Sequence, residues 1–368
     1  MSQQHSGRGI LALEVDGAGA HPAARRAAGL TREDLLAGTR TGQVVLAAES
    51  AGFHAVTFDD GRLAPVQGLV PGVRLDAVQR AAFAAPLTRS IALVPVVDAV
   101  YTEPFHVATQ LASLDYVSRG RAGWIASASG TAAEGAAVGR GAVSGQALSR
   151  EAQDVVEASR LLWDSWEDDA VIRDVASGRY LDSGKLHYAE FRGGSFSVKG
   201  PSIIPRPPQG QLPVLAPAGL VPPGADSGAD AVLVSAPTPE LLLAEAAEHA
   251  ARGPVIAELE IALDSRGRRA VERLAELDAW ELPGPRTELR AQLAGTAEEL
   301  ADYLAQLLAV ARGVRLHPAV LDTELEELGR LVLPRLRAAG LLAPTTPDNT
   351  FRGILGLARP ANRFAAAG

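Results

Sequence analysis

The chain has 368 residues, of which 47% are hydrophobic and 21% charged; these proportions are typical of a globular protein and argue against disorder or a fibrous repeat. Its formal net charge is −8 and lysine occurs only at Lys185 and Lys199, so the clustered cations that bind nucleic acid are missing. The lack of cysteine excludes disulfides, iron–sulfur clusters, Cys-ligated zinc and a thiol nucleophile.

The first nine residues are polar and lack the cationic start and long apolar run of a secretory signal. No uninterrupted apolar stretch reaches the roughly 18 residues that a membrane-spanning helix requires. The spacing of His, Asp and Glu residues matches no metal-binding motif. We therefore expect a cytoplasmic protein that binds neither membranes nor a metal.

Short apolar runs alternate with segments whose apolar residues have helical spacing. The strand candidates are 10–15, 54–58, 91–97, 122–126, 213–216, 231–235, 255–263 and 313–317. The main predicted helices are 42–52, 75–85, 104–118, 149–166, 239–252, one ending at 280, 298–311 and 322–338. Pro104 suits a first helical turn, because the N–H that it lacks would be unpaired there.

Repeated strand–helix units require parallel pairing with right-handed crossovers, and eight of them close into a barrel of about 250 residues plus insertions. We therefore expect an α/β fold, a (β/α)8 TIM barrel, as a single domain over 1–368. Between 167 and 208 the pattern gives way to alternating aromatic, glycine and charged residues, which predicts a hairpin-bearing insertion after the fourth helix. Residues 341–368 form a C-terminal tail.

A doubly wound open sheet is the alternative architecture. Such a sheet usually has a glycine-rich first turn that leads directly into a helix. Residues 17–20, Gly-Ala-Gly-Ala, lack the third glycine and are not followed at once by a predicted helix. The barrel is therefore favoured.

Several long motifs lie on this framework. They are DGAG (16–19) with HPAA (21–24), TEPFH (102–106), SLDYVSRGRAGW (113–124), LWDSW (162–166), FSVKGP (196–201) with PPQG (207–210), and RPANRF (359–364). Together they resemble the luciferase-like flavin-dependent monooxygenases, in particular the branch of nitrilotriacetate and pristinamycin monooxygenases. The likeness is dense from 91 to 211 and thin from 213 to 345.

The resemblance implies a barrel that binds reduced FMN at its C-terminal mouth and uses molecular oxygen to add one oxygen atom to a small organic substrate. A separate NAD(P)H:flavin reductase usually supplies the reduced flavin in this family. Some relatives use a deazaflavin instead. Relatives are commonly dimers, so we expect a homodimer.

In a barrel of this kind, functional residues follow the C-terminal ends of the strands. The candidate cofactor-binding residues are Asp59, Val96, Ser127, Ser129, Arg150 and Gly219. The hydroxyls of Ser127 and Ser129 lie in a loop where the family places phosphate contacts. The family also has an Arg-Tyr pair near the next helix, where this chain has Leu-Ser at 148–149, and Arg150 could substitute for it.

Other departures from the family argue for a second function. Trp124 is followed by apolar rather than polar residues, and Pro222 and Pro223 remove N–H donors from the loop after the fifth strand. Each lost hydrogen bond to a charged group costs about 1.5–3 kcal/mol. Because a shared fold does not by itself transfer chemistry, the alternative is a degenerate flavin-free barrel that acts as a non-catalytic partner subunit or ligand-binding scaffold.

The candidate catalytic residues are His317, His106 and Asp59. Histidines titrate near neutral pH, and His317 has the best position, at the end of the eighth strand. His106 lies in a helix start, where a structural role is the alternative. Asp59 begins an Asp-Asp-Gly turn, so loop capping is its alternative role.

Overall fold

The computed structural model describes residues 8–59, 75–223, 228–280 and 290–365. Its centre is a parallel sheet that closes on itself, because β13 pairs with β1 and β10 pairs with β11. The ring is β1 (Ile10–Glu14), β2 (Ala55–Asp59), β3 (Ala92–Asp98), β4 (Trp124–Ser127), β9 (Val214–Pro217), β10 (Ala231–Val234), β11 (Val255–Leu263) and β13 (Gly313–Pro318). The predicted TIM barrel is confirmed, and all eight predicted strands are present.

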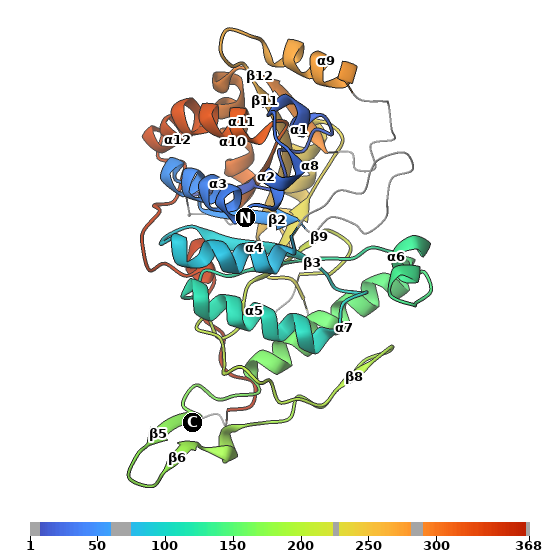
Figure 1. The fold of residues 1–368 in the computed structure, drawn as a ribbon, viewed down its shortest axis with the longest axis vertical. Helices are drawn as coiled ribbons and strands as arrows, with labels where there is room; N and C mark the ends of the chain where they lie inside the picture. Colours follow the sequence, from blue (N-terminus) through green and yellow to red (C-terminus); the bar gives the residue numbers. More distant parts are fainter. Residues whose placement is uncertain (1–7, 60–74, 224–227, 281–289, 366–368) are drawn as a thin grey trace.

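Helices surround the barrel (Figure 1). The longer ones are α3 (Gly38–Ala51), α4 (Ala77–Ala84), α5 (Pro104–Ser118), α7 (Gly145–Asp164), α8 (Pro239–Ala250), α9 (Ala270–Trp280) and α10 (Ala297–Val310). The shorter ones are α1 (Ala24–Ala27), α2 (Arg32–Leu36), η1 (Ala85–Leu87), α6 (Ala132–Ala137), η2 (Ser183–Lys185), α11 (Leu321–Glu327), α12 (Leu333–Ala338) and α13 (Phe351–Leu355). As predicted, Pro104 begins α5, with the Glu103 carboxylate accepting the N–H of His106 at 2.6 Å.

Three features differ from the predictions. α3 and α7 each begin four residues earlier than predicted. The predicted helix 322–338 contains a π-helical turn, η3 (Leu328–Val332), between α11 and α12. An additional short strand, β12 (Ala291–Gly295), pairs with the outer half of β11. Its sequence Ala-Gln-Leu-Ala-Gly contains no β-branched or aromatic residue, so composition gave no strand signal.

The insertion contains two hairpins, as predicted. They are β5 (Val171–Asp174) with β6 (Arg179–Leu181), and β7 (Phe191–Arg192) with β8 (Ser197–Val198). Figure 1 shows them extending away from the barrel, with the C-terminal tail running back to them. The tail is fixed there by Arg359, which forms two hydrogen bonds to Asp168, and by Phe364, whose ring stacks on His187 at 5.3 Å.

The interior of the barrel changes character along its axis. Alternate strand residues face inward. In the lower half, and up to the mouth on β3, β4, β9 and β10, these are apolar and form one cluster: Ile10, Ala12, Ala55, Ala92, Val94, Val96, Ile125, Leu215, Ala231, Leu233 and Ile256. Two residues further along the strands, the inward positions are polar and buried: Glu14, Thr57, Glu258, Arg315 and His317. A second, larger apolar cluster lies between the strands and the helices.

The helix α13 closes the bottom of the barrel. Phe351, Ile354 and Leu355 are buried in the interior apolar cluster. Phe351 lies against Gly123, where an added Cβ would come within 2.4 Å of its ring. A side chain at position 123 would therefore displace the aromatic plug.

We predict that Phe351→Ala lowers the free energy of unfolding by about 3–5 kcal/mol, because it leaves a cavity in a closed interior. Urea denaturation followed by circular dichroism measures the loss. Leu241→Ala, at an exposed position of α8, is the control and should cost less than about 1 kcal/mol. Equal effects of the two substitutions would show that α13 does not seal the barrel.

Candidate functional site

The mouth of the barrel, at the C-terminal ends of the strands, has one charged wall and one apolar wall. Neighbouring strands β11, β13, β1 and β2 form the charged wall, and β3, β4, β9 and β10 form the apolar wall. The inward residues of the charged wall are Glu258, Glu260, Arg315, His317, Glu14, Thr57 and Asp59. Those of the apolar wall include Val96, Ile125, Leu215 and Leu233. A flat molecule in the mouth would therefore have one polar and one apolar face of the barrel beside it.

The guanidinium of Arg315 is the centre of the charged wall. Its Nη1 donates to Glu258 at 2.7 Å, its Nε donates to the Thr57 hydroxyl at 2.9 Å, and its Nη2 contacts Glu14. The Thr57 hydroxyl in turn donates to Glu14 at 2.9 Å, and the Ser235 hydroxyl donates to Glu258 at 2.7 Å. Burial opposes the charge, but the two carboxylates keep the pKa of Arg315 above its usual range.

His317 is buried beside this centre and is uncharged at neutral pH. Its Nε2 lies 3.3 Å from Glu258 Oε1. Burial, followed by the charge of Arg315, lowers the pKa of His317 to about 3. The pKa of Glu258 is held well below its usual range, despite burial, by its bond to His317 and by Arg315. Neutral His317 therefore donates from Nε2, which leaves Nδ1 as an acceptor, and it is a weak base near neutral pH.

The pKa of Glu14, unlike that of Glu258, is shifted upward. Burial raises its pKa to about 7, against the charge of Arg315, and the nearby carboxylates of Asp59 and Asp16 raise it further. Its two hydrogen bonds, from Arg315 and Thr57, both end on Oε2. Its Oε1 is buried and has no hydrogen-bond partner among the described residues.

The loop after β4, which contains the predicted phosphate contacts Ser127 and Ser129, is tied to β3. Asp98 accepts the N–H of Ser129 at 2.8 Å, and it also accepts the N–H groups of Val100 and Tyr101 at 2.7 and 2.8 Å. Ser129 is buried and Ser127 is half-buried. The loop therefore offers hydroxyls to an anion, but the Ser129 N–H is already hydrogen-bonded to Asp98.

The remaining predicted phosphate contacts, Arg150 and Gly219, lie where the second turn of α7 meets the loop after β9. The Ser149 hydroxyl donates to the carbonyl of Gly219 at 3.2 Å. A Cβ on Gly130 would lie 3.6 Å from the Leu148 side chain, so the loop after β4 also reaches this corner. Arg150 and Gly219 are exposed there. Gly219 has φ +86 and no atom within 4 Å of an added Cβ, and the N-terminus of α7 has no side-chain cap.

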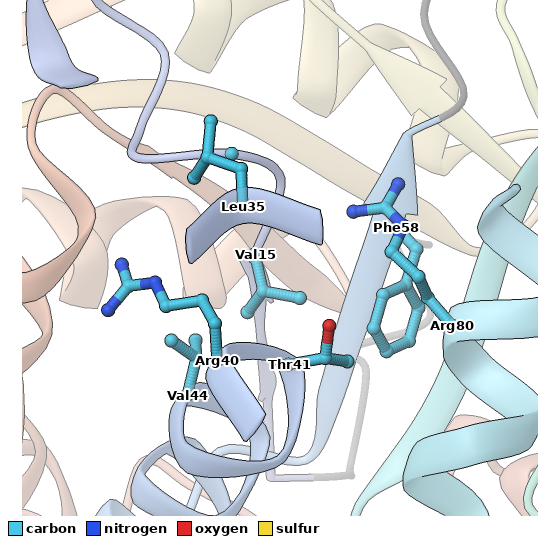
Figure 2. A pocket seen from close by; sticks show the side chains of 8 residues that line it. Val15, Leu35, Arg40, Thr41, Val44, Phe58 and Arg80 are labelled. Carbon is cyan, nitrogen blue, oxygen red and sulfur yellow. The ribbon is translucent and has the colours of Figure 1, made fainter. Parts of the chain in front are cut away.

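Asp59, a candidate for both cofactor binding and catalysis, is positioned through its backbone. Nη2 of Arg80 donates to the Asp59 carbonyl at 2.6 Å, and Nη1 pairs with Asp16 at 2.5 Å. Figure 2 shows the Arg80 guanidinium beside the Phe58 ring, on the side of a small pocket away from Arg40. This pocket has room for little more than a water molecule, so it is not a substrate site.

The structure does not bring all the catalytic candidates together. His317 and Asp59 lie on inward positions of the charged wall, whereas His106 is exposed on the first turn of α5. Glu14, Glu258 and Arg315 were not among the residues predicted for the site. A signal was present, because each alternates with apolar residues inside a predicted strand.

A family model described as "Luciferase-like monooxygenase" matches residues 20–309. The chain is 27% identical over 366 residues to N-acetyl-S-(2-succino)cysteine monooxygenase of Bacillus subtilis (strain 168), covering 76% of this chain and 81% of that protein. It is 35% identical over 208 residues to one of the subunits of pristinamycin IIA synthase of Streptomyces pristinaespiralis, covering 56% and 66%. It is 40% identical over 146 residues to nitrilotriacetate monooxygenase component A of Aminobacter aminovorans, covering 39% and 32%.

Two solved structures are similar over almost their whole length. EDTA monooxygenase from Chelativorans sp. BNC1 has a TM-score of 0.81 at 19% identity, covering 96% of this chain and 99% of that chain. Riboflavin lyase with modified FMN and riboflavin has a TM-score of 0.79 at 22% identity, covering 95% and 96%. At these identities the likeness shows the fold.

The chain belongs to the luciferase-like monooxygenase family. The resemblance to the nitrilotriacetate and pristinamycin branch, which the sequence motifs suggested, is confirmed by the matches to named members of that branch. None of the helices within the described ranges is long and apolar enough to span a membrane. The same residues contain no group of three or more His, Asp or Glu side chains that could hold a metal ion.

We predict that His317→Asn reduces the acid sensitivity of folding. Below pH 6.5 the unfolded chain protonates this histidine, whereas the folded chain resists protonation down to about pH 3. The wild-type free energy of unfolding therefore falls as pH decreases through this window. Urea titrations across the window measure the slope. The control His106→Asn, at an exposed position, should keep the wild-type slope; an unchanged slope in His317→Asn would contradict the assignment.

Proposed function

We propose that the chain is a flavin-dependent monooxygenase that holds reduced FMN in the barrel mouth and acts with molecular oxygen on a small organic substrate. Membership of a monooxygenase family supports this proposal. The observation that carries it is the polar corner at the start of α7, which adjoins a mouth with one apolar and one polar wall. A phosphate matches the polar corner, and a flat ring system matches the mouth with its apolar and polar walls.

The residues present fit the phosphate end of such a cofactor. Gly219 leaves open space for a close approach, and the α7 N-terminus has no side-chain cap to compete with an anion. Helix N-termini and arginine side chains both bind phosphate. We assign phosphate contacts to Ser127, Ser129, Arg150 and Gly219.

The ring end would lie between the two walls of the mouth. Val96 supplies an apolar contact, and Asp59 and His317 lie on the polar side. Bound reduced flavin supplies the activation of oxygen, which is chemistry of the cofactor rather than of the protein. The chain contributes the packing that excludes water and the hydrogen bonds that orient the ring and substrate. Neutral His317, whose Nε2–H is bonded to Glu258, would offer Nδ1 there as a hydrogen-bond acceptor and is not a strong base.

The proposal includes one partner protein and an alternative cofactor. The relative named component A belongs to a system of more than one component, which supports a separate flavin reductase as the source of the reduced cofactor. A deazaflavin is the second possible cofactor, because F420-dependent enzymes share the fold at TM-scores of 0.58 and 0.61. Titration with each cofactor distinguishes them.

We predict that Arg150→Ala weakens binding of reduced FMN by about tenfold, because one charge-assisted contact to phosphate is lost. Binding of riboflavin, which lacks the phosphate, should be unchanged. Anaerobic titration followed by absorbance and calorimetry measures both. The control is Arg252→Ala, an exposed arginine of another helix end. An equal loss for FMN and riboflavin would argue against a phosphate contact.

The same titration decides between the enzyme and the flavin-free barrel. Capture of the Ser129 N–H by Asp98 is the observation that favours the flavin-free alternative. Binding of reduced FMN at micromolar concentrations by the wild type supports the enzyme. If a folded wild type binds neither flavin nor deazaflavin, a non-catalytic partner or scaffold function takes its place.

We also propose a homodimer formed through α3 and α4. Figure 1 shows these helices side by side. Leu46, Phe83 and Leu87 are each 41–49% exposed. Phe83 packs over Gly38, two turns before Leu46, and Leu87 packs over Gly42, one turn before Leu46. The two helices therefore present a continuous apolar stripe. Val78 of α4 and Leu111 of α5 are buried in the cluster between the strands and the helices, so they are not part of this stripe.

We predict that Phe83→Asp converts a dimer to a monomer, because it places a charge in the apolar stripe. Light scattering after size exclusion measures the mass. Val175→Asp, at a 95% exposed position of the β5–β6 hairpin, is the matched control and should leave the mass unchanged. A wild type that is already monomeric would refute the interface.

A further inference from the structure

Two buried glutamates share one arginine in the charged wall. Glu14 and Glu258 are each 7% exposed, and Arg315 between them is 4% exposed. One guanidinium neutralises one carboxylate. If both buried carboxylates were ionised, Arg315 would balance only one of the two negative charges, which is costly unless the other group takes up a proton.

The hydrogen bonds decide which glutamate remains ionised. Glu258 receives three donors on its two oxygens, from Ser235, Arg315 and His317. Both donors to Glu14 end on Oε2, so its Oε1 receives none from the residues that the structure describes. A carboxylate is stabilised by donors to both oxygens, so Glu258 is the ionised partner. The proton belongs on Glu14, and since Oε2 is already an acceptor, it belongs on Oε1.

The surroundings of Glu14 favour the same assignment. The charged groups that face it are Arg315 from β13, Asp59 from β2 and Asp16 after β1. Arg315 is shared with Glu258, and the two aspartates oppose a further negative charge. The rise of the Glu14 pKa to about 7, caused mainly by burial, agrees with this arrangement.

We propose that Glu14 carries a proton on Oε1 at neutral pH and donates it in a hydrogen bond to an acceptor oxygen or nitrogen of the molecule bound in the mouth. This assignment rests on the proposed function for the identity of the bound molecule. The chemical class of that contact is a carbonyl, a ring nitrogen or an oxyanion. A buried neutral carboxyl binds such an atom without the repulsion that an ionised carboxylate would cause.

A first experiment tests the proton itself. Infrared difference spectra of the full chain, between pH 6 and pH 9, detect the carbonyl stretch of a neutral carboxyl that ionises in this window. We expect Glu14→Gln to remove one such band. Glu324 is a matched control, because it is buried outside the mouth and burial also raises its pKa to about 7. Glu324→Gln should remove its own band and leave that of Glu14. A spectrum that is unchanged in Glu14→Gln overturns the proposal.

A second experiment tests the contact, with reduced FMN as the probe. Glutamine keeps a donor but cannot ionise, so Glu14→Gln should bind independently of this proton, while the wild type weakens as Glu14 ionises. The ratio of the wild-type to the Glu14→Gln dissociation constant should rise about tenfold between pH 6 and pH 9. Titration of the ligand itself changes both constants equally, so it does not affect this ratio. Glu324→Gln should follow the wild type. A constant ratio overturns the contact.

The two experiments separate this assignment from the proposed function. If the wild type binds no reduced FMN at any pH, the proposed function fails, whereas the infrared band still decides whether Glu14 is protonated. If the band is present and FMN binds, but the ratio of the two dissociation constants does not change with pH, the proposed function stands and the Glu14 contact is refuted. Glutamine is close to glutamate in size, and Arg315 keeps its hydrogen bond to Glu258, so the variant should fold. Circular dichroism checks this.

Discussion

A guanidinium inside a closed barrel has no bulk water around it, so every group that solvates it must come from the strands. Arg315 meets this constraint through side chains on three neighbouring strands. Because each contact joins a different strand, the charge fixes the relative height of β1, β2 and β11 at the mouth. The position of Glu14, the tautomer of His317 and the polar character of the whole wall depend on this arrangement.

The interior has an apolar part, at the bottom and along β3, β4, β9 and β10, and a polar wall around Arg315 at the mouth. The lower half provides the apolar burial that stabilises the barrel, and α13 seals it. The upper half concentrates buried charges, whose burial is unfavourable unless they are paired. Such groups usually occur where a protein acts on a ligand. The stable part of the fold and the part available for chemistry therefore lie at opposite ends of the same strands.

Much of the fold was predictable, because it depends on local patterns. The eight strands were evident as apolar runs, and Pro104 marked the start of a helix. The candidate site was predictable only by position: His317 was placed at the mouth, but its low pKa depends on its burial and on the charge of Arg315, against the effect of Glu258 on another strand. The committed N–H of Ser129 could not be foreseen, since the Asp98 that holds it is 31 residues away. Such contacts depend on tertiary structure and leave no local pattern.

The closure of the barrel also constrains how the chain is made. The first strand, β1, pairs with β13, and the bottom of the interior is filled by Phe351 in α13. Because a ribosome releases the chain from its N-terminus, β1 and its neighbour β2 emerge long before β13 and α13. One of its edges and the apolar floor beneath it must wait until almost the whole sequence has been translated. Completion of the core is therefore a late event in biosynthesis, and until then an unpaired sheet edge and apolar surface stay open to wrong contacts.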